Sequence, residues 1–128
     1  MNNEFVSYEI ALKLKELGFD EPCFGKIYAD GGSEQLSYTY KNSDQIGKVT
    51  SCSAPLYQQV FRWFREKYDI DISINTIYSK YNENISKKYR VVIDNKTVFT
   101  NVGFYDTYEE AQIECIMDLI SIIKNQKK

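Results

Sequence analysis

The sequence predicts a single α+β domain in which three helices cover an antiparallel sheet of about five strands. Three segments show the apolar spacing of amphipathic helices, and five shorter segments have the composition of strands. The predicted order along the chain is α-β-β-α-β-β-β-α. No linker rich in proline or glycine divides the 128 residues, and this length is sufficient for one hydrophobic core.

The first helix is expected over residues 8–17. Ser7 precedes it as an N-cap, and Gly18 follows where a left-handed residue would end the helix. One face of this helix is apolar and consists of Ile10, Ala11, Leu14 and Leu17. The helix is therefore expected to bury that face and expose its charged residues.

A hairpin is expected next, after a connector over residues 18–25. Its strands span residues 26–29 and 35–40, and the turn at 30–33 has the sequence Asp-Gly-Gly-Ser, which is typical of tight turns. The following stretch, residues 41–51, is polar and is expected to form a loop.

The second helix, residues 54–68, shows the clearest pattern in the chain. Ser53 is the expected N-cap, and Pro55 lies in the first turn, where its missing N–H group costs nothing. The apolar stripe covers roughly 160° of the helix. It consists of Leu56, Tyr57, Val60, Phe61, Trp63, Phe64 and Tyr68. Trp63 lies at the margin of the stripe: if buried it belongs to the core, which we expect, and if half exposed it would anchor a partner.

Three further strands are expected over residues 70–78, 89–93 and 97–102. The polar stretch 80–88 is expected to turn the chain between the first two, and residues 94–96 form a tight turn between the last two. The alternation of isoleucine with polar residues in the first of these strands indicates that one face is buried.

The third helix is expected over residues 108–124. Thr107 and Glu110 have the spacing of a capping box at its start. The predicted core combines the apolar faces of all the elements. It consists of Leu14, Leu17, Leu56, Val60, Phe61, Phe64, Ile72, Ile74, Val91, Ile93, Ile116, Leu119 and Ile120.

Composition excludes several classes of function. The chain has no histidine, which excludes Ser-His-Asp and Cys-His catalysis and every metal site built on imidazole. The formal net charge of −2 gives no overall attraction to nucleic acid or anionic lipid. The start of the chain lacks the pattern of a signal peptide, and no stretch is long and apolar enough for a membrane span. We therefore expect a cytoplasmic protein that has no contact with a membrane.

The three cysteines are expected to be buried free thiols. Cys23, Cys52 and Cys115 are odd in number and widely spaced, which favours neither a disulfide framework nor a zinc site. Cys52 lies near the start of the second helix, where a thiol pKa can be lowered, yet no histidine can serve as its base. Asp69 and Asp71 share a strand face but lack a third ligand, so no metal and no cofactor are expected.

Two groups of residues are candidates for binding. The outward face of the second helix carries Gln58, Gln59, Arg62 and Arg65, a composition found both in protein-interaction surfaces and in ordinary solvated helices. The stretch 80–96 interleaves basic and aromatic residues, which could bind phosphates and stack on bases. Its candidate residues are Lys80, Tyr81, Lys87, Lys88 and Arg90. A solvated hairpin would have the same composition.

Three stretches of the chain carry a resemblance to a known group. They are residues 14–25 (LKELGFDEPCFG), 53–67 (SAPLYQQVFRWFREK) and 107–115 (TYEEAQIEC). Together they resemble small uncharacterised proteins encoded by phages and prophages of gut Bacteroidetes. The resemblance implies a bacterial cytoplasm and a mobile-element origin. It implies no activity and assigns no functional residues.

These observations lead to three hypotheses on function. The first is a non-enzymatic accessory protein of phage or mobile-element origin that binds another protein. The alternative is a small nucleic-acid-binding module that uses the hairpin over residues 80–96. The third is an enzyme built on carboxylates or on Cys52, which would need a concave pocket with convergent polar groups. The sequence does not fix the oligomeric state.

Overall fold

The structure is a computed structural model that describes residues 4–44, 51–95 and 99–126. In these residues the protein has an α+β fold with three helices and two antiparallel sheets. This confirms the predicted fold class. The elements, in chain order, are α1 (Tyr8–Glu16), β1 (Cys23–Tyr28), β2 (Ser33–Tyr40), the 3-10 turn η1 (Asn42–Asp44), β3 (Ser51–Ala54), α2 (Tyr57–Tyr68), β4 (Ile70–Tyr81), β5 (Asn84–Asn95), β6 (Phe99–Tyr105) and α3 (Tyr108–Gln126).

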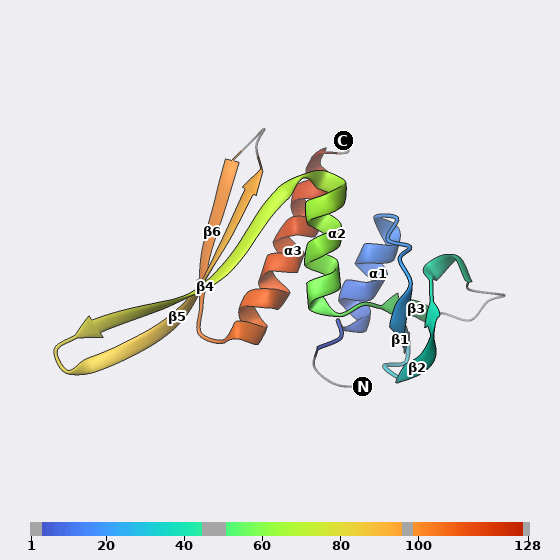
Figure 1. Cartoon of the computed structure of the whole chain (residues 1–128), viewed down its shortest axis with the longest axis horizontal. Coiled ribbons are helices and arrows are strands. Elements are labelled where there is room, and N and C mark those ends of the chain that lie inside the picture. Colours follow the sequence, from blue (N-terminus) through green and yellow to red (C-terminus); the bar gives the residue numbers. More distant parts are fainter. Residues whose placement is uncertain (1–3, 45–50, 96–98, 127–128) are drawn as a thin grey trace. The chain divides into compact units, whose positions relative to one another are not determined.

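The described strands form two sheets of three strands, where the sequence predicted one sheet of about five (Figure 1). The first sheet has the order β2-β1-β3, and the second has the order β4-β5-β6. The additional strand is β3, which lies at the end of the stretch expected to be a loop. All pairs of neighbouring strands are antiparallel.

The contacts within the chain define two compact units. The first contains residues 1–60 and 124–128, and the second contains residues 61–123. The first unit holds α1 and the sheet β2-β1-β3, whereas the second holds the sheet β4-β5-β6 and most of α3. A single domain stays a prediction.

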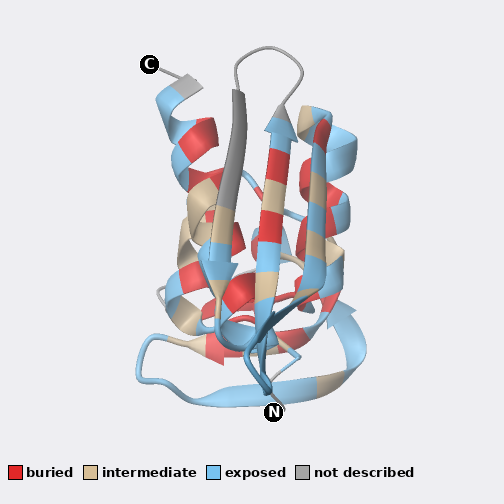
Figure 2. Ribbon diagram, turned by 90° about the vertical axis from the view of Figure 1, so that its left-hand side faces the viewer, coloured by how far each residue is buried: buried red, intermediate tan, exposed pale blue. Residues whose placement is uncertain are grey.

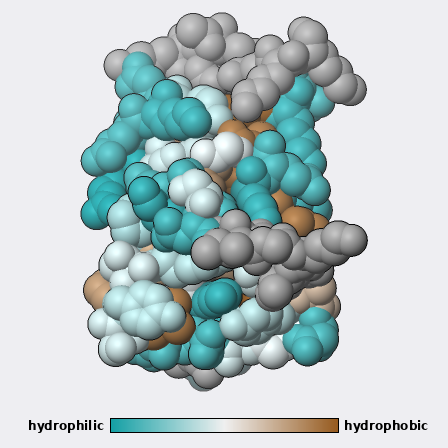
Figure 3. Space-filling view, turned by 90° about the vertical axis from the view of Figure 1, so that its right-hand side faces the viewer, coloured by the Kyte–Doolittle hydropathy of each residue, from teal (hydrophilic) through white to brown (hydrophobic). Residues whose placement is uncertain are grey.

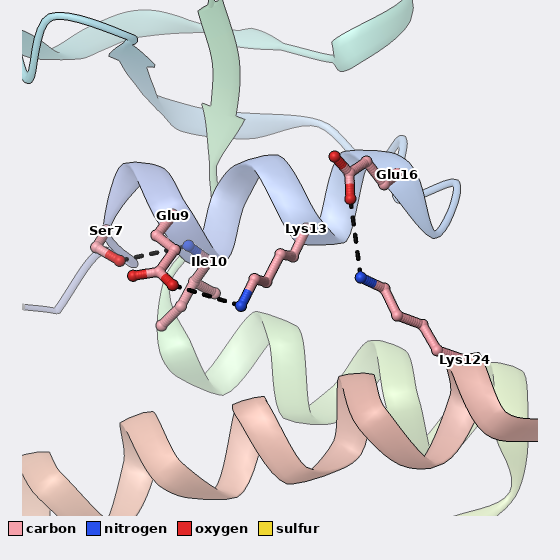
Figure 4. Close-up of polar contacts among 6 residues, drawn as sticks. All are labelled: Ser7, Glu9, Ile10, Lys13, Glu16 and Lys124. Atoms are coloured by element: carbon pink, nitrogen blue, oxygen red, sulfur yellow. Dashed lines mark hydrogen bonds and ion pairs between the residues drawn. The ribbon is translucent and has the colours of Figure 1, made fainter.

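The helix α1 follows its predicted pattern. The backbone N–H of Ile10 donates to Ser7 Oγ at 3.4 Å, which confirms Ser7 as the N-cap (Figure 4). Gly18 has a φ of 97°, a left-handed conformation that glycine adopts without a steric penalty. Lys13 forms an ion pair with Glu9, and Lys124 pairs with Glu16 at 3.9 Å (Figure 4). These exposed pairs contribute little to stability.

The start of α2 differs from the prediction. Ser53 is not the N-cap, because it lies in β3 and its N–H donates to Asn42 Oδ1 at 2.9 Å. The helix begins at Tyr57, so Pro55 precedes it rather than lying in its first turn. Leu56 was expected in the core but is exposed, since it lies just before the helix and forms an isolated bridge with Phe5.

The core of the second unit contains most of the residues predicted for it. Phe61, Phe64, Val91, Ile93, Ile116, Leu119 and Ile120 are buried. Ile72 and Ile74 are only partly buried. In Figure 2, buried residues (red) alternate with less buried ones along β5, where that strand lies between β4 and β6. Trp63 is 6% exposed and contacts Phe64 and Tyr68 edge to face, so it belongs to the core.

The strands β4 and β5 are longer than predicted. The stretch 80–88 was expected to turn the chain, but only Asn82 and Glu83 form the turn, and Asn82 has a φ of 56°. The predicted tight turn at 94–96 is wrong in part, since β5 continues to Asn95, and residues 96–98 lie outside the described residues. The N–H of Glu110 donates to Thr107 Oγ1 at 3.1 Å, which confirms the cap of α3.

Gly25 is the position at which the first unit tolerates no side chain. A Cβ atom there would lie 2.4 Å from the Ala54 carbonyl oxygen and 2.7 Å from the ring of Phe5. Gly25→Ala is expected to lower the free energy of unfolding by about 1–3 kcal/mol through overpacking. Denaturant titration measures this effect.

Gly32→Ala is the matched control for that substitution. The nearest atom to its new Cβ belongs to the flexible side chain of Asp30, at 3.0 Å, and the loss should stay below about 1 kcal/mol. Equal stability of the two variants would contradict the packing of Phe5 against Gly25.

Candidate functional site

The distal part of the β4–β5 hairpin is the most prominent candidate site. The two strands pair over twelve positions, from Ile70 with Asn95 to Tyr81 with Asn84, whereas β6 pairs with β5 only from Tyr89 onward. Among the described strands none pairs with residues 77–88 from outside, so these residues form a two-stranded ribbon, which we call the arm. Figure 1 shows it extending beyond β6.

The arm carries the three most exposed large apolar side chains of the described residues. Tyr81 is 79% exposed, Ile85 is 69% exposed and Tyr78 is 67% exposed. Exposed aromatic and aliphatic side chains that lie together, rather than singly, mark binding surfaces. Tyr81 was among the residues predicted to bind, whereas Ile85 was not, because most of its neighbours in the sequence are polar.

The register places alternate residues of the arm on opposite faces. Tyr78 is opposite Lys87, and Lys80 is opposite Ile85, so these four side chains share one face. We call this face, made of Tyr78, Lys80, Ile85 and Lys87, the inner-register face. It has two apolar and two basic side chains.

Lys87 is held between two tyrosines. Its Nζ atom lies 5.9 Å from the centre of the Tyr78 ring and 5.3 Å from that of Tyr89. These contacts are cation–π interactions, in which the ammonium group is attracted to the face of each aromatic ring. A hydrogen bond with Tyr89 raises the pKa of Lys87, so this side chain stays charged. Tyr89 contacts Tyr108 edge to face.

The basic residues predicted for nucleic-acid binding are all exposed but do not share one surface. Lys80 and Lys87 lie on the inner-register face, whereas Tyr81, Lys88 and Arg90 lie on the opposite face. Lys88 forms an ion pair with Asp106, which partly neutralises its charge. The fifth basic residue of the stretch, Lys96, lies outside the described residues.

Three of the four candidate residues of α2 are exposed, and the fourth, Gln59, is half-buried. Gln58, Arg62 and Arg65 are exposed. Gln59 instead donates to the Pro22 carbonyl oxygen at 3.0 Å and to Glu21 Oε1 at 3.3 Å. Its amide therefore fixes the start of β1 to the helix within the first unit.

The three thiols are not activated as nucleophiles. Burial raises the pKa of Cys23 to about 11 and that of Cys115 to about 12, and it also raises the pKa of Cys52. Cys52 lies in β3, opposite Ile27, and not at the start of a helix. The environment of each thiol thus favours the neutral form, which reacts slowly.

The two carboxylates considered for a metal belong to no larger group of possible ligands in the described part of the chain. Asp69 joins α2 to β4 with a φ of 53°, and Asp71 lies opposite Asp94 in the sheet. Within residues 4–44, 51–95 and 99–126, no three cysteine or acidic side chains gather as a metal site would require.

A small hollow lies in the first unit, lined in part by β1 and β2. Its volume is about 240 Å³, which is below the range of about 300–1,000 Å³ that small-molecule pockets occupy. It is lined by Glu4, Phe5, Phe24, Gln35, Leu36, Leu56 and Gln59. Phe24 and Leu56 are exposed, and Figure 3 shows apolar surface (brown) on the side of the molecule where β1 and β2 lie in Figure 1.

An irregularity in strand pairing involves residues that line the hollow. In the register of β1 with β2, Gly25 pairs with Gln35 and Cys23 pairs with Tyr40. The two pairs are two residues apart along β1 but five residues apart along β2. The backbone of β2 between these pairs therefore bulges away from β1 opposite Phe24. A bulge of this kind bends the strand and redirects its side chains.

Comparisons with known proteins give no match: no protein-family model, no curated protein and no solved structure is significantly similar to the chain. In the part of the chain that the structure describes, none of the helices combines the length and hydrophobicity that crossing a bilayer demands.

The raised thiol pKa values predict slow modification of the folded protein. At mildly alkaline pH all three cysteines should react with a thiol reagent far more slowly than in denaturant. The raised pKa values also make the stability of the fold depend on pH. Below pH 9 the thiols are neutral and their contribution to stability is fully present. This contribution should be lost as the pH rises through about 11 for Cys23 and about 12 for Cys115, because the buried thiols then ionise.

Reaction rates with and without denaturant, followed by peptide mapping, provide the measurement. One thiol that reacts as fast in the folded state as in the unfolded state would contradict the burial of that cysteine.

Proposed function

We propose that this protein is a non-enzymatic interaction protein and that the arm is the element it presents to its partner. The observation that carries the proposal is that Tyr78, Tyr81 and Ile85 are all strongly exposed on a ribbon with which no further described strand pairs. Tyr78 and Ile85 share one face of this ribbon, and Tyr81 lies on the other. Tyrosine contributes a large contact area with few rotatable bonds, so it is enriched where proteins bind one another.

The rest of the chain supports binding better than catalysis. Each cysteine has a raised thiol pKa, the sequence contains no histidine, and the hollow in the first unit is smaller than a substrate pocket. A recognition role requires only an accessible surface on a stable scaffold. The arm provides that surface, and the three-stranded part of the sheet provides its support.

The proposed setting is the cytoplasm of a bacterial cell. It rests on the resemblance to proteins of phages and prophages, and on cysteines that are all free thiols. A partner in this setting would be a protein of the host or of the mobile element.

Replacing the apolar side chains of the arm should abolish partner binding without unfolding the protein. The variant Tyr78→Ser/Tyr81→Ser/Ile85→Ser removes exposed side chains only, so its melting temperature should stay close to that of the original chain. Proteins retained by the immobilised chain from bacterial lysate, quantified by mass spectrometry, should be lost with the variant.

The matched control replaces exposed apolar residues elsewhere, at Tyr38 and Ile113. This control should retain the same proteins as the original chain. If no retained protein depends on the arm, or if the control loses the same proteins, the arm is not the recognition element.

Nucleic acid is the second candidate partner, and the charge of the arm is the observation that favours it. Lys80, Lys87, Lys88 and nearby Arg90 outnumber Glu83, and a two-stranded ribbon fits the major groove of duplex DNA. Two features of the arm disfavour binding of nucleic acid. The cations are divided between two faces, and Lys88 is paired with Asp106.

Salt dependence tests this alternative. Four cations release at most about 3.6 counterions from duplex DNA, so the binding constant should fall with salt with a logarithmic slope no steeper than about −3.6. Lys80→Ala/Lys87→Ala/Lys88→Ala/Arg90→Ala should abolish the binding. Fluorescence anisotropy with labelled single-stranded and duplex oligonucleotides measures both effects, and no binding at low salt excludes the alternative.

A further inference from the structure

The hollow of the first unit and the inner-register face of the arm have complementary chemistry. We propose that the arm of one copy of this chain docks in the hollow of a second copy, with Ile85 inserted among Phe24, Leu36 and Leu56. The inference rests on the proposed role of the arm as the recognition element. Each surface is complete within one compact unit.

The size of the hollow selects one side chain rather than a free ligand. Its volume of about 240 Å³ is too small for most small-molecule ligands. A branched aliphatic side chain that projects from a ribbon is of a size to enter it. Ile85 is the most exposed aliphatic side chain of the described residues, and it lies two positions from the turn of the arm.

The walls of the hollow match an apolar guest. Phe5, Phe24, Leu36 and Leu56 provide the apolar surface, and Leu56 is 40% exposed although it precedes a helix with a strongly apolar face. Burying Ile85 against these side chains would remove apolar surface of both partners from water. This is the main favourable contribution to association.

The charged residue that lines the hollow is opposite in sign to those of the arm. This residue is Glu4, and Glu21, which accepts a hydrogen bond from the lining residue Gln59, is not itself part of the lining. The arm has Lys80 directly opposite Ile85, with Lys87 next along the same face. Insertion of Ile85 would therefore bring the Lys80 ammonium group towards the Glu4 carboxylate. Such complementarity fixes orientation and speeds association.

The contact is heterologous, because the arm and the hollow are different surfaces. This property makes a complementation experiment decisive. Ile85→Asp destroys the arm surface and leaves the hollow intact, whereas Leu56→Asp destroys the hollow and leaves the arm intact. Each variant alone should be monomeric at concentrations where the original chain associates, because a buried unpaired carboxylate weakens association by about tenfold or more.

An equimolar mixture of the two variants should form a complex with one copy of each. Only one pair of intact surfaces remains in the mixture, namely the arm of Leu56→Asp and the hollow of Ile85→Asp. Light scattering after size-exclusion chromatography and sedimentation equilibrium, from micromolar to millimolar concentration, measure the masses. The original chain should associate further at the same concentrations.

Ile113→Asp is the control, since Ile113 is 38% exposed and lies in α3, outside both surfaces. It should associate like the original chain. A monomeric original chain at every concentration, or a mixture of the two variants that stays monomeric, overturns the inference.

Failure of self-docking and failure of the proposed function give different results. If the original chain is monomeric but the arm variant still loses proteins from lysate, the arm binds another protein and only the self-docking is wrong. If an oligonucleotide binds the arm instead, the partner is a nucleic acid. If the chain associates but Ile85→Asp has no effect, the arm is not the contact.

Discussion

The unequal length of the strands in the sheet β4-β5-β6 is the constraint on which the candidate site depends. β4 and β5 pair over twelve positions, and β6 covers β5 over only seven. A two-stranded ribbon is barely stable alone in water, so the arm exists because its strands continue into a three-stranded sheet with a buried face. Val91 and Ile93 anchor β5 in the core, and the same strand carries Ile85 and Lys87 outward.

Most elements of the fold could be predicted because their signals are local. The caps Ser7 and Thr107, the left-handed Gly18 and the apolar stripe of α2 each depend on neighbours within a few residues. The strand β3 could not be predicted, since its four small residues are all buried and show no alternation. Its pairing with β1, at residues 25–28, is a long-range contact that no local pattern encodes.

The candidate site was only partly predictable for a related reason. The interleaved basic and aromatic residues around Lys87 and Tyr81 predicted a binding site in the stretch that forms the arm. Neighbouring residues of a strand point to opposite faces, so Lys87 and Lys88 are separated once this stretch is a strand. This division was missed because residues 80–88 were expected to form a turn, where that alternation does not apply. A further limit applies to Gln59, whose outward position on a helical wheel gave no indication of its bond to Pro22.

The lysines of the arm also have a role that needs no partner. Along residues 77–88 the ribbon has two unpaired edges, and such edges invite pairing with any other extended chain. Charged side chains suppress this pairing, so Lys80, Lys87 and Lys88 would be useful on the arm even if it bound nothing. Protection alone, however, does not account for Tyr78, Tyr81 and Ile85, since large apolar side chains on an unpaired ribbon increase the risk of aggregation. Their presence beside the lysines is expected if the arm has a specific surface to bury them.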